Sequence, residues 1–229
     1  MRRIAILAIV VGLAGSLTAS GSSSPLTPQA VLRSIHAAAL AQTSVHWGQH
    51  HFVPGKWSRR WISDVSKTAG TQVGILGYPI AGGKIQEMLV DGIVYIKGNA
   101  AGLQDATDLT ETQATTYADQ WISIPQDDEL YAQTSNGLTL ASIVHGETPF
   151  GKLKLLRKTS QGKPFFVVRS GRPFRMSLSA PAKGKRLPVR FQSWFGPHER
   201  LTGTFSNWNE PVNVEAPASS IPIATVRGG

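Results

Sequence analysis

The chain has 229 residues, of which 41% are hydrophobic and 16% charged, and this composition excludes an intrinsically disordered protein. It contains no cysteine, so the fold uses no disulfide and its stability comes from packing. The formal net charge of +9 indicates either contact with an anionic partner or a solvated basic face that keeps the protein soluble.

The N-terminus has the pattern of a signal peptide. Arg2 and Arg3 precede the apolar run 4–17, which is too short for a membrane span, where about 20 apolar residues are needed. Residues 17–24 resemble a lipoprotein signal, but Ser20 stands where the lipid-bearing cysteine would be. Because a serine hydroxyl is a weaker nucleophile than a thiolate, we expect no attached lipid.

Two explanations of Ser20 remain open: a naturally soluble exported form, or a cysteine that was replaced. An ordinary secretory signal cut after Ala19 or Ser20 is a third reading. In each case we expect export to the cell envelope, a periplasm-like space or the exterior, with a membrane anchor only if the native residue is cysteine. The expected organisation is a signal peptide at 1–20, a linker at 21–26, one domain at 27–218 and a tail at 219–229.

An amphipathic helix is expected over 28–42. Thr27 and Pro28 form a helix start, and apolar residues follow at helical spacing: Val31, Leu32, Ile35, Ala38 and Ala39.

Short runs rich in β-branched and aromatic residues follow the helix, separated by turn residues. They predict strands at 45–53, 57–66, 71–78, 84–90 and 93–98, and later at 152–159, 164–169, 173–179, 188–195, 200–206 and 211–215. Strands at this spacing, without helices between them, predict an antiparallel meander.

The clearest unit is a hairpin whose turn is Asp91-Gly92. This turn pairs Val90 with Ile93, Met88 with Tyr95, Leu89 with Val94 and Glu87 with Ile96. Both faces are apolar near the turn. We therefore expect either a cover on each face, or a concave face that holds an apolar guest.

The segment 100–149 interrupts the meander. It has polar helix-forming runs at 105–117, a strand-like piece at 121–125 and a second helix at 138–145. We interpret it as helices laid over the sheet.

The motifs give no support for catalysis. The histidines His46, His50 and His51 do not all share one face of a strand, and we expect no acidic residue nearby to complete or orient a site, so we expect no metal site. There is no nucleophile elbow, phosphate loop or dinucleotide fingerprint, and we expect no cofactor. Among the tryptophans, Trp61, Trp121 and Trp194 are expected in the core, and Trp47 and Trp57 at a rim.

Four motifs in order resemble the LolA-like lipoproteins of actinobacteria, the LprG and LppX type. They are the near-lipobox at 17–24 together with the first helix ending in AQTSVHW (41–47), the hairpin VDGIVYIKGNAAGL followed by YADQWISIP, the strand LPVRF, and the closing FSNWNEPVNVEAPA. The resemblance implies an α+β fold: a strongly curved antiparallel sheet, or half-open barrel, with helices packed on its concave face. It also implies a non-enzymatic lipid carrier with an apolar pocket between sheet and helices.

Combining the hairpin with the segment placed over it gives the pocket residues we expect: Met88, Val90, Val94, Ile96, Trp121, Leu140 and Ile143. The partner is then a lipid or another amphiphile, and the protein is expected to be a monomer.

The basic residues concentrate in 150–200, where 13 Lys or Arg accompany one acid, Glu199. A patch for an anionic membrane or an envelope protein is expected at Arg169, Arg172, Arg175, Lys183, Lys185 and Arg186, and nucleic acid is excluded by the exported address. The alternative function is an envelope interaction module with a fully packed sheet, whose basic face docks an anionic polymer, membrane or protein.

Overall fold

The computed structural model describes residues 26–77, 82–171, 175–196 and 198–228, without the side chain of Trp57. The predicted signal peptide with Ser20, and Arg172 of the basic patch, lie outside the described residues. Within these ranges, no helix combines the length and the apolar character that a membrane span requires.

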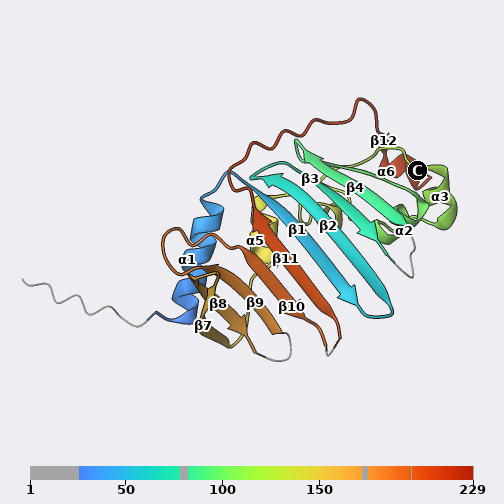
Figure 1. Ribbon diagram of the computed structural model, residues 1–229. Helices are drawn as coiled ribbons and strands as arrows, with labels where there is room; N and C mark the ends of the chain where they lie inside the picture. The colour runs from blue at the N-terminus through green and yellow to red at the C-terminus, as the bar shows by residue number, and fades with distance from the viewer. Residues whose placement is uncertain (1–25, 78–81, 172–174, 197, 229) are drawn as a thin grey trace, which may run out of the picture.

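One curved, open sheet organises the molecule (Figure 1). Its order across the described residues is β12-β6-β5-β4-β3-β2-β1-β11-β10-β9-β8-β7, antiparallel except between β12 and β6. The strands are β1 (Ser44–Val53), β2 (Trp57–Ser66), β3 (Gly70–Leu76), β4 (Gly83–Val90), β5 (Ile93–Gly98), β6 (Ile122–Ile124), β7 (Leu153–Ser160), β8 (Lys163–Ser170), β9 (Arg175–Pro181), β10 (Arg190–Trp194), β11 (Arg200–Ser206) and β12 (Ile221–Pro222). The half-open, strongly curved sheet expected from the sequence is confirmed.

The helices lie on one side of this sheet, its concave side. They are α1 (Pro28–Leu40), α2 (Ala100–Ala106), α3 (Glu111–Thr116), α4 (Tyr131–Thr134), α5 (Leu140–Gly146) and α6 (Ile223–Val226). Figure 1 shows α1 beside β7 to β9, α5 behind β1 and β11, and α3 and α6 together at the other end.

Helix α1 forms as its sequence predicts. The Thr27 hydroxyl accepts a hydrogen bond from the Ala30 amide at 3.1 Å, and Pro28 occupies the first turn, where no amide hydrogen is needed. The buried residues Val31, Leu32, Ile35 and Ala39 form one face. This face packs against the sheet.

The predicted hairpin register is confirmed. The structure pairs Val90 with Ile93, Leu89 with Val94, Met88 with Tyr95, and Glu87 with Ile96. Asp91 and Gly92 both have positive φ, 49° and 77°, as a two-residue turn of this kind requires.

Two expectations at the C-terminus are wrong. Residues 211–215 form no strand, because β11 already has β1 and β10 on its two sides and leaves no edge there. The chain instead follows the ends of the strands to the opposite edge of the sheet (Figure 1). Residues after 218 are part of the domain: β12 pairs with β6, and Ile223 and Val226 are 1% and 2% exposed.

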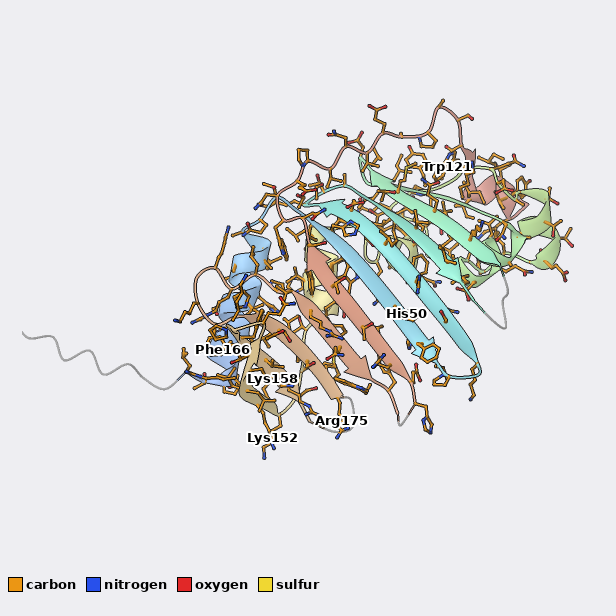
Figure 2. All side chains as sticks on the ribbon, in the orientation of Figure 1. His50, Trp121, Lys152, Lys158, Phe166 and Arg175 are labelled. Atoms are coloured by element: carbon orange, nitrogen blue, oxygen red, sulfur yellow. The ribbon has the colours of Figure 1, made fainter. Side chains whose placement is uncertain are left out.

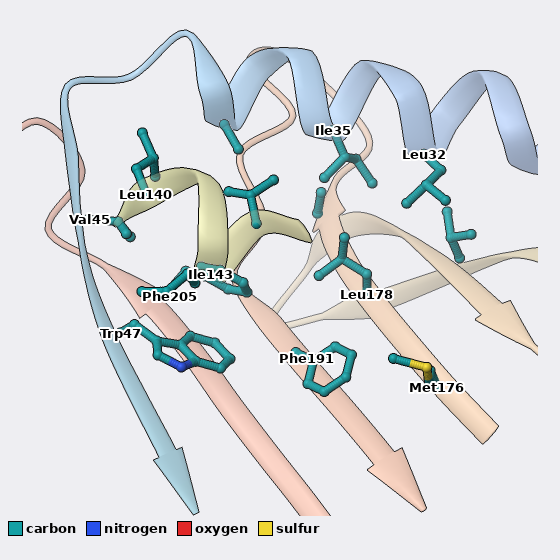
Figure 3. Packing of buried hydrophobic residues seen from close by; sticks show 14 of the residues in the cluster. Leu32, Ile35, Val45, Trp47, Leu140, Ile143, Met176, Leu178, Phe191 and Phe205 are labelled. Atoms are coloured by element: carbon teal, nitrogen blue, oxygen red, sulfur yellow. The ribbon is translucent and has the colours of Figure 1, made fainter. Parts of the chain in front are cut away.

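The buried side chains form two clusters. The first, which we name the α1 core, joins α1 and α5 to β1 and β8–β11. Figure 3 shows Leu32 and Ile35 above Leu178, and α5 above the layer that contains Trp47 and Phe191. The second, the β5 core, lies at the other end and contains Ile85, Leu89, Val94, Ile96, Leu103, Leu109, Ala114, Ile122, Ile124, Leu130, Leu138, Ile223 and Val226.

Candidate ligand cavity

A cavity of about 490 Å³ opens on the concave side of the sheet. Trp47, Ile143, Met176 and Phe191 of the α1 core line it from one side, and Trp61, which packs against the β5 core, lines it from the other. The cavity therefore lies where the two cores do not meet. The remaining lining residues are Gln49, Arg59, Gln72, Glu87, Asp105, Ala106, Gln133, Thr134, Asn136, Gly137, Ser142, Gly146, Glu147, Ser193, Phe195 and Leu201.

Two glycines allow the tryptophans to lie close against the sheet. A Cβ placed on Gly203 of β11 would be 1.7 Å from the Trp47 ring, and one on Gly74 of β3 would be 2.3 Å from the Trp61 ring. Trp47 also packs on Phe205 at 4.4 Å between ring centroids. The two indole rings therefore form an aromatic floor of the cavity. They occupy space that a side chain at Gly203 or Gly74 would fill.

The wall on β3 and β4 is polar. Gln72 Nε2 donates to Glu87 Oε2 at 2.9 Å, and Ser63 Oγ donates to Gln72 Oε1 at 2.8 Å. Glu87 is only 4% exposed, and burial raises the pKa of its carboxyl to about 7. The hydrogen bond from Gln72 opposes this rise without cancelling it.

A second buried carboxyl, Glu147, lies at the C-terminus of α5. Its Oε1 accepts a hydrogen bond from Gln49 Nε2 of β1 at 3.2 Å, and burial raises the pKa of this carboxyl to about 8. Two carboxyl groups with pKa values near neutrality thus line one cavity.

Ser193 of β10 also faces this space. It is 1% exposed, and its Oγ has no hydrogen-bond partner among the described residues. A buried hydroxyl without a partner is costly in a folded protein, so such groups mark places where a water or a ligand atom completes the structure.

The outer part of the cavity carries an ion pair. Arg59 of β2 contacts the carboxylate of Asp105 at the end of α2. This ion pair joins the sheet to the helical segment beside the cavity. Phe195, which is 45% exposed and lies at the end of β10, is also at the outer part of the cavity.

The structure places the seven expected pocket residues at different sites. Ile143 lines the cavity. Leu140 is buried in the α1 core, and Val94 and Ile96 are fully buried in the β5 core. These three lie among packed side chains outside the cavity lining.

The other three expected pocket residues are outside the lining as well. Met88 and Val90 alternate with Glu87 and Leu89 on β4 and so point to the opposite face of the sheet. Trp121 is half-buried with the Lys97 ammonium 5.8 Å from its ring centroid.

Sequence reasoning missed the polar residues of the cavity. Glu87 could have been found from the sequence, because the predicted register places its carboxyl on the apolar face that carries Leu89 and Val94. Trp47 is 3% exposed and its assignment to a rim is wrong, because Gly203 leaves room for its ring on the concave face.

The histidines of β1 have acidic neighbours in space. His46 Nδ1 lies 2.7 Å from Asp64 Oδ1, and His51 Nε2 lies 2.8 Å from Glu199 Oε1. The expectation that no acid is near them is wrong, because β2 and the β10–β11 turn bring these carboxylates alongside. No group of three or more potential metal ligands occurs within the described ranges.

The expected basic patch divides between two faces. Arg186 donates to Ser34 Oγ of α1 at 2.9 Å and lies 5.2 Å from the Phe166 ring centroid, and Lys185 donates to Gln42 at 2.8 Å. These two residues join the loop before β10 to α1 and the residues that follow it. Lys183 and Arg175 are exposed, and Figure 2 shows Arg175 at the same end of the sheet as Lys152 and Lys158.

Arg169 belongs to a groove of about 450 Å³ on the convex face of β7–β10. Lys158 and Arg190 are its other cations, and Phe165 and Trp194 its aromatic residues. No acidic residue is among the groove residues that the structure describes.

Comparison of the structure with solved proteins identifies the fold. The Mycobacterium tuberculosis lipoprotein LppX matches with a TM-score of 0.52 at 17% identity, over 82% of this chain and 98% of LppX. LprF from Mycobacterium bovis matches with a TM-score of 0.50 at 14% identity, over 84% of this chain and 97% of LprF. A LolA superfamily protein from Nitrosomonas europaea aligns at 9% identity, over 82% of this chain and 96% of that protein, with a TM-score of 0.30.

Comparison by sequence gives no match, either to a family model or to a curated protein. The likeness is therefore one of fold, at low identity. The chain has the fold of LppX and LprF, as the resemblance of its sequence motifs implied.

Proposed function

We propose that the protein is an exported, non-enzymatic protein that binds or carries a lipid or another amphiphile. The cavity between the sheet and α5 is the observation that carries this proposal. Its volume of about 490 Å³ is in the range of small-molecule sites, and its aromatic floor lies beside polar groups. A site of this composition suits a ligand with an apolar and a polar end.

Apolar burial supplies the affinity. Each methylene transferred from water onto Trp47, Trp61 and Phe191 contributes about 0.8 kcal/mol. About five or more buried methylenes are therefore needed to offset the roughly 4 kcal/mol or more of translational and rotational freedom lost on binding. The polar wall then orients the ligand rather than holding it.

The expected export of the protein supports the same role, that of an amphiphile-binding protein. The apolar run 4–17 after Arg2 and Arg3 is a pattern of exported proteins, and the fold is shared with the lipoprotein LppX and with LprF. The family that the sequence resembles consists of envelope lipid carriers. With serine at position 20 we expect no lipid anchor on the mature protein, and an anchor only if the native residue is cysteine.

The proposal is tested by titrating the purified protein with an environment-sensitive fluorescent fatty amine. Leu201→Arg places a charge in the cavity lining, and Thr202→Arg places the same charge on the opposite face of the same strand. We expect binding to be lost in Leu201→Arg and kept in Thr202→Arg. Equal binding by both variants contradicts the proposal.

The groove on the convex face favours a second candidate function, an envelope interaction module that docks on anionic phospholipid. Lys158, Arg169 and Arg190 gather there beside Trp194. Each cation close to an anionic bilayer contributes about 1 kcal/mol, an attraction that salt screens.

Sedimentation with phosphatidylglycerol vesicles tests this candidate. We expect Lys158→Glu to weaken binding about fivefold or more, and Lys67→Glu, in the distant β2–β3 turn, to leave it unchanged. Equal effects of the two variants, or binding that ignores salt, count against a docking groove.

A further inference from the structure

We infer that the cavity selects its ligand by the polar end: it takes an amphiphile whose head carries hydrogen-bond donors and no negative charge. This inference rests on the proposed function and adds the chemical class of the ligand. It follows from the hydrogen-bond donors and acceptors that the lining leaves available.

Six side chains of the lining that can donate hydrogen bonds already contact acceptors of the protein. Gln49 and Gln72 donate to the two buried carboxyls, at 3.2 and 2.9 Å. The Ser142 and Thr134 hydroxyls donate to the main-chain carbonyls of Thr139 and Leu130, at 2.8 and 2.9 Å, and Gln133 Nε2 donates to the Ala106 carbonyl at 3.2 Å. The Arg59 guanidinium contacts Asp105.

The acceptors are not used to the same extent. Glu87 receives its hydrogen bond from the described side chains on Oε2, and Glu147 receives its bond on Oε1, so each carboxyl keeps a second oxygen. A carboxylate can accept about four hydrogen bonds. Ser193 Oγ, 1% exposed and without a partner among the described residues, adds a hydroxyl to the same lining that can accept a hydrogen bond from the ligand as well as donate one.

The charged groups of the lining also favour a head without negative charge. The cavity lining contains the carboxyl groups of Glu87, Glu147 and Asp105 and one cation, Arg59, which already contacts Asp105. An anionic head would meet like charge wherever the carboxyls of Glu87 and Glu147 are ionised, or would require both to be protonated, and either condition disfavours it at pH 7.5 in a poorly solvated space. A hydroxyl or ammonium head supplies the donors that these acceptors lack.

Three 12-carbon amphiphiles separate the possible heads: monolauroylglycerol, dodecylamine and laurate. Their binding is measured at pH 7.5 by the fluorescence of Trp47 and Trp61, which line the cavity. We expect monolauroylglycerol or dodecylamine, or both, to bind at least tenfold more tightly than laurate. The tighter of the two shows whether the head is a hydroxyl or an ammonium.

The variant Glu87→Gln/Glu147→Gln removes both carboxyls with little change of shape, and Glu111→Gln, exposed on α3, is the matched control. We expect the double variant to reduce the preference for dodecylamine over laurate at least tenfold and the control to preserve it. Thermal melting verifies that both variants are folded.

Two outcomes overturn the inference and are distinct from failure of the proposed function. In the first, laurate binds as tightly as the other two amphiphiles. In the second, the double variant keeps the preference unchanged. Either result shows that these residues do not select the head group, although the cavity still binds acyl chains. Absence of binding by all three amphiphiles to the folded protein contradicts the proposed function itself.

Discussion

The same strands build a closed core and an open cavity. Along β1 the concave positions are Val45 and Trp47, both buried in the α1 core, and then Gln49, which faces the cavity. Along β10, Phe191 reaches both regions and the next concave residue, Ser193, faces the cavity. Along β1 and β10, the concave positions near α1 carry apolar side chains, and those at the cavity, Gln49 and Ser193, carry polar ones.

This difference shows that the cavity is specified by the sequence rather than left by imperfect packing. A packing defect would be lined by the same aliphatic residues as the core around it. Here glutamate, glutamine and serine occupy concave positions between two apolar clusters, at the cost of two buried carboxyls.

The largest expected effect comes from shortening a buried side chain of the α1 core. Leu178 is 2% exposed beneath α1, so Leu178→Ala should lower the free energy of unfolding by about 2–5 kcal/mol. Leu201→Ala, beside the cavity and only partly buried, should cost about 1 kcal/mol. Urea denaturation measures both, and equal losses would contradict the distinction between core and cavity.

The next effect is a dependence of stability on pH. The carboxyl pKa values of Glu87 and Glu147 are raised by burial from 4.5 to about 7 and about 8, so the folded protein binds more protons than the unfolded chain. Stability from these groups is complete below about pH 4.5 and falls as the pH rises through 7 and 8. Glu87 alone accounts for about 3 kcal/mol.

The pH effect is measured as the difference in unfolding free energy between the parent protein and Glu87→Gln/Glu147→Gln. The variant should become the more stable of the two as the pH increases from 5 to 9. A difference that does not change over this range would show that the carboxyls are hydrated in the folded state.

A smaller effect is expected at the aromatic floor. Gly203→Ala places a methyl group where the Trp47 ring lies and should destabilise the protein by about 1–3 kcal/mol. Gly48→Ala on β1 is the control, because its nearest contact is an ordinary 3.4 Å from Thr204. The displaced ring should also shift the tryptophan emission, and an unchanged spectrum and stability would contradict the close contact.

The smallest effect concerns the start of α5. The Thr139 hydroxyl accepts a hydrogen bond from the Ser142 amide at 3.1 Å, and the Thr139 amide donates one to Ser142 Oγ at 3.2 Å. Thr139→Ala should cost about 1 kcal/mol of unfolding free energy. Thr116→Ala, at the exposed end of α3, should cost less, and the reverse order would show that α5 does not depend on its cap.

Local patterns allowed much of the fold to be predicted. The Asp91-Gly92 turn fixed the register of β4 and β5, and Thr27-Pro28 fixed the start of α1, because both depend on neighbours in the chain. The strand expected at 211–215 failed for the opposite reason. Whether that segment pairs depends on which sheet edges are free, and this is settled by β1 and β10, far away in sequence.

The candidate site could be predicted only in part. Ile143, which belongs to the expected helix, lines the cavity, but Val94 and Ile96 belong to a core that α2, α3 and α6 close. Glu147 and Gln49, 98 positions apart, meet only because α5 crosses β1. Such a contact leaves no periodic signal in either segment.

The most direct measurement is mass spectrometry of organic extracts from the mature protein, purified without detergent from an actinobacterial host. We predict close to one bound amphiphile per protein molecule, with a head that carries hydroxyl or amine groups. A folded protein that is empty, and that remains empty after incubation with envelope lipids, would contradict the proposal that this cavity binds an amphiphile.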